Sequence, residues 1–160
     1  MTETSRKVSA FEARTRLGEL LDYVRYTKKP CYIDRHGKVV AVLTDIETFQ
    51  QKGLQAQYQE WIDRALDQIK TRYQPEKIIL FGSAAKGEPI EGSDIDFFII
   101  KETKKRKLDR ADELIEILDP DIPAECHIYT PKEIEERLRL GDSFIQKIFD
   151  EGKILYERKK

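Results

Sequence analysis

Two aspartates stand where their side chains could share a metal ion. Asp94 and Asp96 are two residues apart, at the start of the apolar run at residues 97–100, which indicates a buried strand. Alternate residues of a strand lie on one face, so both carboxylates are expected to point the same way. Carboxylate oxygens are ligands that hard divalent cations prefer, Mg²⁺ first. The pair therefore predicts a magnesium site.

A glycine–serine pair ten residues upstream predicts a site for phosphate. Gly82 and Ser83 follow the apolar run at residues 78–81, a second buried strand. Gly82 has no Cβ, so backbone amides there can approach an anion closely, and the Ser83 hydroxyl adds a donor. A metal that bridges a triphosphate and an attacking oxygen is the usual apparatus of nucleotidyl transfer. The alternative is a glycine turn with two surface aspartates; the agreement of turn, spacing and strands favours the site.

The sequence FGSAAKG at residues 81–87, followed by SDID at residues 93–96, resembles the minimal nucleotidyltransferases of the DNA polymerase beta superfamily. The resemblance implies a nucleotidyltransferase fold, a mixed sheet flanked by helices. It implies one or two Mg²⁺ as cofactor and ATP as substrate. The residues implied to bind the nucleotide are Gly82, Ser83 and Lys86, and Asp94 and Asp96 are implied to be catalytic metal ligands.

The same family supplies a third acid from the strand before a Thr-Pro-capped helix. Here the matching residue is Glu125, in the expected strand at residues 124–129, and the resemblance implies that it is a catalytic residue and a metal ligand. Strand alternation places Glu125 and His127 on one face. The family usually has Asp at this position, and the extra methylene of Glu alters the metal distance or the general-base geometry. A harmless salt bridge at the strand end is the alternative.

The first 50 residues have a different character. Residues 1–43 hold nine Lys or Arg and five Asp or Glu, although the whole chain has a formal net charge of −1. Ser9 and Glu12 fit a capping box before a helix, and a hairpin is expected around Gly37. Residues 1–7 are expected to be loose. Residues 6–50 resemble the amino-terminal domain of Phd/YefM antitoxins, which implies a dimer that binds operator DNA. In that family a carboxy-terminal tail masks a toxin, and here the nucleotidyltransferase replaces that tail.

The small size and the basic side chains of this unit agree in part with the resemblance. A unit of this size buries too little apolar surface to be stable alone, so a homodimer is expected. Four basic side chains surround the start of the first helix, and we expect them to contact DNA phosphates, with two as possible readers of bases. Ordinary solvated charges are the alternative. The four are Arg6, Lys7, Arg14 and Arg16.

These patterns predict an α+β chain of two domains. The first is the dimerisation and DNA-binding module at residues 1–53, and the second is the nucleotidyltransferase at residues 54–160. A capping box at Thr44 and Glu47 opens a long helix, expected from Ile46 to Arg72. Further helices are expected at residues 108–118, from Pro131 through Leu138, and after a cap at Asp142. The end of the chain is expected to be an extended tail.

Composition narrows the function classes further. The apolar runs are shorter than the ~20 residues that span a bilayer, and the polar start is unlike a signal peptide, so a cytoplasmic protein without membrane contact is expected. Cys31 and Cys126 have no metal-ligand spacing and are expected to be reduced core thiols.

Three functions follow from these observations. The first is an antitoxin that transfers AMP from ATP to a hydroxyl of a partner toxin, of the HEPN type by resemblance. The second is a scaffold that binds the toxin directly and represses its own operon, with Glu125 marking lost catalysis. Transfer to an aminoglycoside or an RNA end is less favoured because the chain leaves no room for a separate recognition domain.

Overall fold

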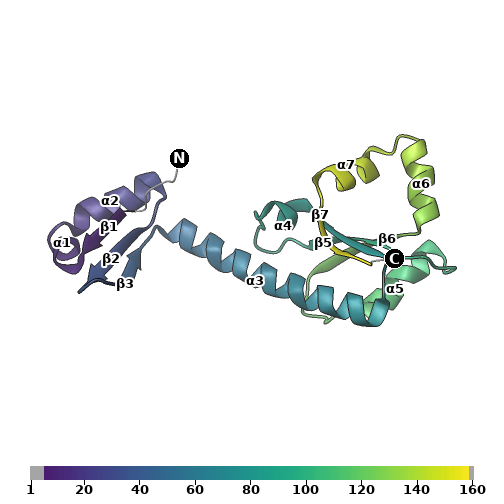
Figure 1. Ribbon diagram of the computed structural model, residues 1–160, viewed down its shortest axis with the longest axis horizontal. Helices are drawn as coiled ribbons and strands as arrows, with labels where there is room; N and C mark the ends of the chain where they lie inside the picture. Colours follow the sequence, from purple (N-terminus) through teal and green to yellow (C-terminus); the bar gives the residue numbers. More distant parts are fainter. Residues whose placement is uncertain (1–5, 159–160) are drawn as a thin grey trace. The chain divides into compact units, whose positions relative to one another are not determined.

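The computed structural model describes residues 6–158, and the chain divides into two compact units, residues 1–53 and 54–160 (Figure 1). Each unit has its own sheet and its own hydrophobic core. The predicted α+β fold class is confirmed, because helices and mixed sheets occur in both units. The division falls within helix α3, Ile46–Gln68.

The amino-terminal unit packs two helices on a three-stranded sheet. The strand order is β1-β2-β3, with β1 parallel to β2 and β3 antiparallel to it. The core is small and consists of Val8, Ala13, Leu20, Val24 and Cys31. The elements are β1 Arg6–Ser9, α1 Ala10–Thr15, α2 Leu17–Thr27, β2 Cys31–Arg35 and β3 Lys38–Leu43.

Two expectations for the start of this unit are wrong. Of residues 1–7, which were expected to be loose, Arg6 and Lys7 belong to β1 and pair with β2, and residues 1–5 lie outside the described part of the chain. The expected single helix is broken at Arg16, whose backbone (φ −123°, ψ 29°) leaves the helical region between α1 and α2. The cap before α1 does form, since the Ser9 hydroxyl accepts a hydrogen bond of 3.1 Å from the amide of Glu12.

The hairpin is confirmed and the second cap is displaced by one residue. His36 and Gly37 both have positive φ, 55° and 81°, as a two-residue turn between twisted strands requires. Before α3, the Asp45 carboxylate rather than Thr44 accepts a hydrogen bond of 3.2 Å, from the amide of Thr48. Asp is as good an N-cap as Thr, so the sequence offers two adjacent candidates and the structure selects the second.

The carboxy-terminal unit is a four-stranded mixed sheet in the order β6-β5-β4-β7. β5 and β6 are parallel, and the other pairs are antiparallel. The expected tail is instead a strand, β7, which pairs with β4 at the edge of the sheet. After α3, the elements are the π-helix Ile69–Tyr73, β4 Lys77–Phe81, α4 Gly82–Lys86, β5 Ile95–Ile100, α5 Lys107–Ile115, β6 Ala124–Tyr129, α6 Pro131–Arg139, α7 Ser143–Glu151 and β7 Lys153–Glu157.

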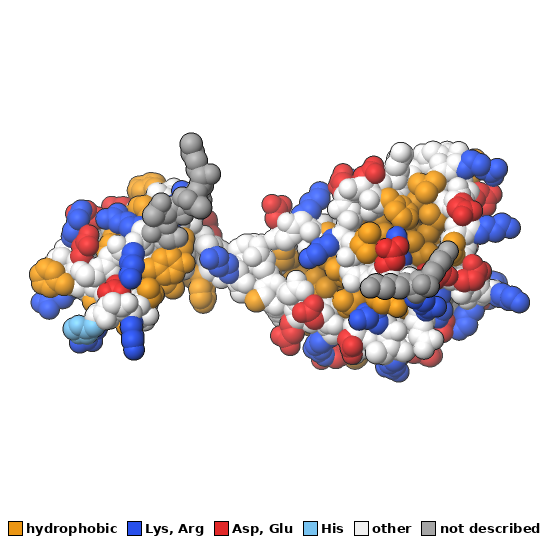
Figure 2. Space-filling model, viewed as in Figure 1, with side chains coloured by type: hydrophobic (Ala, Val, Ile, Leu, Met, Phe, Trp, Pro, Cys, Tyr) orange, Lys and Arg blue, Asp and Glu red, His pale blue; other side chains and the backbone are white. Residues whose placement is uncertain are grey.

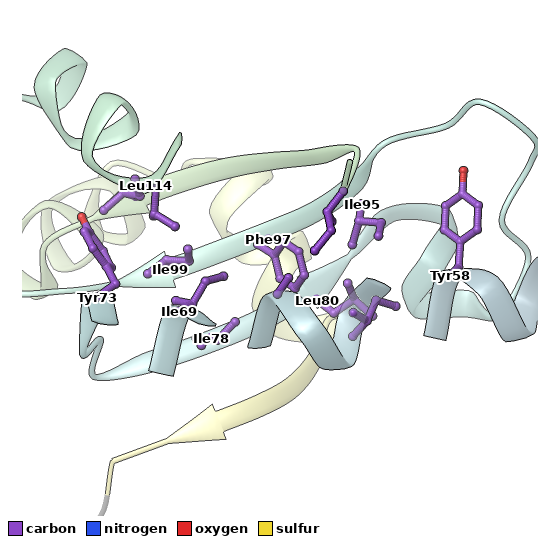
Figure 3. Close-up of a cluster of buried hydrophobic side chains, with 13 residues drawn as sticks. Tyr58, Ile69, Tyr73, Ile78, Leu80, Ile95, Phe97, Ile99 and Leu114 are labelled. Atoms are coloured by element: carbon purple, nitrogen blue, oxygen red, sulfur yellow. The ribbon is translucent and has the colours of Figure 1, made fainter. Parts of the chain in front are cut away.

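Two hydrophobic clusters cover the two faces of this sheet. On one face, side chains of α3, the π-helix and α5 pack against alternate residues of β4 and β5, such as Leu80 and Phe97 (Figure 3). On the other face, Ile79 and Phe98 pack against residues of α6 and α7. Gly152 ends α7 tightly against β4, because a Cβ there would lie 2.5 Å from the side chain of Ile79. The continuous apolar runs of β4 and β5 are explained by burial on both faces.

Cys31 is buried, as expected for a core thiol, whereas Cys126 is only partly buried. Cys31 and Cys126 are free, and each lies in a strand. Burial raises the pKa of Cys126 to about 12, which keeps its thiol protonated at neutral pH.

The third capping box forms as predicted and continues into a partly buried ion pair. The Thr130 hydroxyl accepts from the amide of Glu133, and the Glu133 carboxylate accepts from the amide of Thr130. The guanidinium of Arg110 on α5, only 5% exposed, donates to both carboxylate oxygens of Glu133 at 2.6 and 2.9 Å. This pair holds α5 and α6 to the end of β6.

The Arg110–Glu133 pair is expected to make the free energy of unfolding of the protein sensitive to acid. The hydrogen bonds and charge of Arg110 lower the pKa of Glu133 from 4.5 to about 2. A lowered pKa gives stability that is complete above pH 4.5 and is lost as the pH falls toward 2. We expect the free energy of urea unfolding, followed by Trp61 fluorescence, to fall more steeply over this window in the wild type than in Glu133→Gln. Parallel curves for the two proteins would contradict this assignment.

Candidate active site

Asp96 lies at the centre of the site that the sequence predicts. It is the second residue of β5, opposite Phe81 on β4 and Glu125 on β6. Paired residues of adjacent strands share a face, so Asp96 and Glu125 lie on the face that α6 and α7 cover. Asp94 lies one residue before β5, at the same end of the strand.

Gly82 and Asp96 fit against each other closely. Gly82 begins α4 with φ +72°, and a Cβ on this residue would lie 2.0 Å from Oδ2 of Asp96. The Asp96 carboxylate therefore occupies the space that any other residue at position 82 would fill. The expected Gly82–Ser83 turn is the first turn of a short helix, and it places Gly82 directly beside the carboxylate.

The negative charges of the site interact. Burial raises the pKa of Asp96, the negative charge of Glu125 raises it further, and that of Asp94 adds to this. His127 acts in the opposite direction. A partly desolvated carboxylate with negative neighbours favours a cation beside it.

Glu125 is engaged by a histidine. Nε2 of His127 lies 3.2 Å from Oε1 of Glu125, so the expectation that these two residues share a face is consistent with the geometry. The His127 ring lies against the rings of Phe81 and Phe144, with centroid distances of 5.5 and 5.6 Å. Glu125 is thus turned toward His127, and its contact with a partner resembles the salt bridge that the sequence left as an alternative.

The residues present fit Mg²⁺ in the manner that a nucleotide site requires. Within residues 6–158, no three His, Cys, Asp or Glu side chains converge closely enough to hold an ion by themselves. Mg²⁺ is commonly held by one or two carboxylates, with substrate phosphates and water completing the octahedron. Asp94 and Asp96 beside the small Gly82 provide such an arrangement.

Helix α3 holds the loop that joins the two parts of the site. The Tyr58 hydroxyl is buried and lies 2.5 Å from the carbonyl oxygen of Ser93 and 3.0 Å from that of Ile90. The Gln55 amide donates to the carbonyl of Gly87 at 2.6 Å. These contacts fix the segment between α4 and Asp94, and the apolar periodicity of the helix gave no sign of them.

A cavity of about 220 Å³ opens beside Gly82, between α4 and α7. At its rim, Nζ of Lys86 lies 3.7 Å from a carboxylate oxygen of Glu151. Lys86, which the sequence assigned to phosphate binding, is therefore close to Gly82 and pairs loosely with α7. The cavity is lined by Phe81, Gly82, Lys86, Phe144, Lys147, Ile148 and Glu151.

Comparison with known families agrees with this geometry. Residues 62–155 match the family model described as a nucleotidyltransferase domain. The chain belongs to the nucleotidyltransferase domain family. Residues 5–68 match a second family model, the Phd/YefM antitoxin of type II toxin–antitoxin systems. The protein therefore combines an antitoxin domain with a nucleotidyltransferase domain, as the sequence resemblances implied.

Among solved structures the chain has a match at low sequence identity. A crystal structure of a candidate nucleotidyltransferase from Sulfolobus solfataricus matches with 14% identity and a TM-score of 0.49. The match covers 69% of this chain and 89% of that one. No curated protein matches the chain. Among the described residues, no helix is long and apolar enough to cross a membrane.

Several residues of the nucleotidyltransferase site were missed by sequence reasoning. His127 was noted only for its face of the strand, and the helix with Phe144 and Lys147 was expected to be a packing element. The amphipathic pattern of α7 gives its buried stripe, yet no local signal shows that its first turn lies against the catalytic end of β4. The pairing of β7 with β4 and the packing of Ile145 and Ile148 against the sheet bring α7 there.

The four predicted DNA-binding residues have different surroundings in the antitoxin domain. The Arg6 guanidinium lies over the Tyr23 ring, and Lys7 pairs with Asp34 at 3.0 Å. Arg14 is exposed on α1. Arg16, at the helix break, forms ion pairs with Glu12 and Glu19.

Proposed function

We propose that this protein is an antitoxin that transfers AMP from ATP to a hydroxyl of a partner toxin, with the HEPN-type toxins as the expected class. The observation that carries the proposal is the close fit of the Asp96 carboxylate against Gly82, which joins the metal ligands to the phosphate-binding motif. The match to a nucleotidyltransferase family supports the reaction type. The antitoxin domain implies a toxin as partner.

The donor nucleotide is held at the start of α4. Backbone amides near Gly82 and the hydroxyl of Ser83 receive the outer phosphates, and Lys86 neutralises part of their charge. Asp94 and Asp96 hold one or two Mg²⁺, which supply Lewis-acid stabilisation of the charge on the transferring phosphoryl group. Because Gly82 lies against the Asp96 carboxylate, phosphates held at Gly82 would place the α-phosphorus near the carboxylates.

Glu125 is the proposed proton acceptor for the attacking hydroxyl. The acceptor oxygen forms a bond to the α-phosphorus, its proton passes to the Glu125 carboxylate, and the bond to pyrophosphate breaks. His127, 3.2 Å away, restrains this flexible side chain. The aromatic rings of Phe81 and Phe144 restrain His127 in turn. The additional methylene of Glu is compatible with this role because a base must reach the hydroxyl rather than complete a rigid metal cage.

The amino-terminal unit is the proposed dimerisation module. Its hydrophobic side chains reach the surface, as Figure 2 shows in orange. On β3, Val40 and Val42 lie on one face and are 59% and 53% exposed. On α2, Leu17 and Leu21 are about half exposed. A second copy of the unit would remove this apolar surface from water.

The direct test is the mass of the toxin encoded beside this protein. The purified toxin is incubated with the full chain, ATP and MgCl₂, and its intact mass is measured. A gain of one AMP group that requires the chain supports the proposal. Neutralisation of the toxin without any gain in mass would overturn it.

A second function is a scaffold that binds the toxin and represses its own operon. The contact of Glu125 with His127 favours it, because this acid is not turned toward a metal. In that case toxin neutralisation survives the combined substitution Asp94→Ala and Asp96→Ala. The mass test above and this substitution together separate the scaffold from the enzyme.

If the chain binds operator DNA, Arg14 is expected to contribute to the salt dependence of that binding. We expect the full chain to shift its upstream promoter DNA, and Arg14→Ala to reduce the slope of log K against log salt by about 1–2 if a dimer presents the residue twice. The shift is measured by fluorescence anisotropy from 50 to 200 mM salt. Lys38→Ala, in the hairpin, is the matched control and should keep the slope. Equal slopes in all three proteins would exclude Arg14 from the interface.

A further inference from the structure

The cavity between α4 and α7 has an apolar interior and a charged rim. The rings of Phe81 and Phe144 meet edge to face at a centroid distance of 5.8 Å. Ile148, one turn further along α7, contributes an aliphatic wall. The side chain of Lys147 lies at the rim with the Lys86–Glu151 pair. Flat apolar walls beside cations are suited to a ring attached to an anionic group.

The cavity is continuous with the proposed triphosphate site. Gly82 lines the cavity, and the same residue contacts the Asp96 carboxylate. A ligand whose phosphates lie at Gly82 therefore has this cavity within reach. Its volume of about 220 Å³ is below the roughly 300–1,000 Å³ of sites for drug-sized ligands, so it accommodates one ring system rather than a whole nucleotide.

We propose that this cavity binds the nucleobase of the donor nucleotide, so that α7 forms half of the donor site. This inference rests on the proposed nucleotidyl transfer. Phe144 is the main stacking residue, because its side chain is 40% exposed and lies against both Phe81 and His127. Stacking on an aromatic side chain tolerates any base, so ATP and GTP are expected to bind with affinities within about fivefold of each other.

Separating the base from the phosphates gives a sharp experiment. Binding of ATP and of inorganic tripolyphosphate to the full chain is measured by calorimetry, each with MgCl₂. We expect Phe144→Ala to weaken ATP binding about tenfold, as the loss of one stacked base implies, and to leave tripolyphosphate binding unchanged. Phe149→Ala is the matched control. Phe149 is on the same helix and is also 40% exposed, but its ring lies against Phe98 and outside the cavity.

Three other outcomes would overturn the inference. An equal loss of affinity for both ligands would mean that Phe144 supports the phosphate site and not a base. Unchanged ATP binding together with slower transfer would assign the cavity to the acceptor side chain instead. Because the readout is binding, it is independent of transfer. Transfer that proceeds with an unaltered KM for ATP in Phe144→Ala would refute the base site and leave the proposed function intact. ATP binding that depends on Phe144, without any transfer, would support the base site and refute the proposed function.

Discussion

Asp96→Asn is expected to abolish AMP transfer while leaving the fold at least as stable. The substitution keeps the shape that packs against Gly82, but it removes the charge that is proposed to hold the metal. Because metal ions supply several kcal/mol of transition-state stabilisation, the rate is expected to fall on the order of a thousandfold. The measurement is the rate of mass gain on the toxin.

Stability distinguishes this loss from misfolding. Burial and the charges of Glu125 and Asp94 raise the pKa of Asp96. A raised pKa means that the ionised carboxylate destabilises the folded state at neutral pH, so the neutral amide removes this penalty. Without divalent cations, the melting temperature of Asp96→Asn is therefore expected to equal or exceed that of the wild type. Added MgCl₂ should raise the melting temperature of the wild type only. A variant that melts earlier and also loses activity would leave the role of Asp96 unsupported.

Gly82→Ala is expected to damage both the fold and the site. The backbone at Gly82 has φ +72°, and the new Cβ would lie 2.0 Å from Asp96 Oδ2. Left-handed backbone strain and overpacking together imply a loss of about 3 kcal/mol in the free energy of unfolding. Since the Asp96 carboxylate must move, we also expect transfer to fall by roughly a hundredfold or more. Urea unfolding and the toxin mass assay measure the two effects.

Gly87 provides the matched control for this substitution. It has almost the same backbone, φ +74°, but a Cβ there meets no atom within 4 Å. Gly87→Ala therefore isolates the backbone strain, about 1 kcal/mol, and should retain activity. The double variant Gly82→Ala with Asp96→Ala should recover the stability of Gly87→Ala, because the colliding atoms are gone. If Gly82→Ala and Gly87→Ala are equally stable, the contact with Asp96 does not determine the need for glycine.

The catalytic motif was predictable because it is local. The Gly82–Ser83 pair and the Asp94–Asp96 pair each follow or begin an apolar run, so strand periodicity alone predicts where they lie. The family resemblance then supplied Glu125, whose place opposite Asp96 follows from the register of two parallel strands. The prediction of the third cap was also correct, because its two residues, Thr130 and Glu133, are only three positions apart in the sequence.

The errors arose where distant segments determine local structure. Arg6 and Lys7 have no strand signal of their own, and they become a strand only by pairing with β2. The sequence after Gly152 is compatible with a tail, and it is the free edge of β4 that makes it a strand. For the same reason the position of Phe144 was not predicted, since its contacts with Phe81 and His127 join three elements.

The close packing of Gly152 against β4 and α7 limits how α7 can move. A Cβ at this position would lie 2.4 Å from the carbonyl oxygen of Ile148 and 2.5 Å from Ile79, so α7 cannot slide along β4 without a change of backbone. The opening beside Gly82 is therefore set by main-chain packing, while its chemistry is set by side chains one turn apart on α7. Exchanges at positions 144 and 147 would therefore change the lining of this cavity without a change in the main chain that carries it.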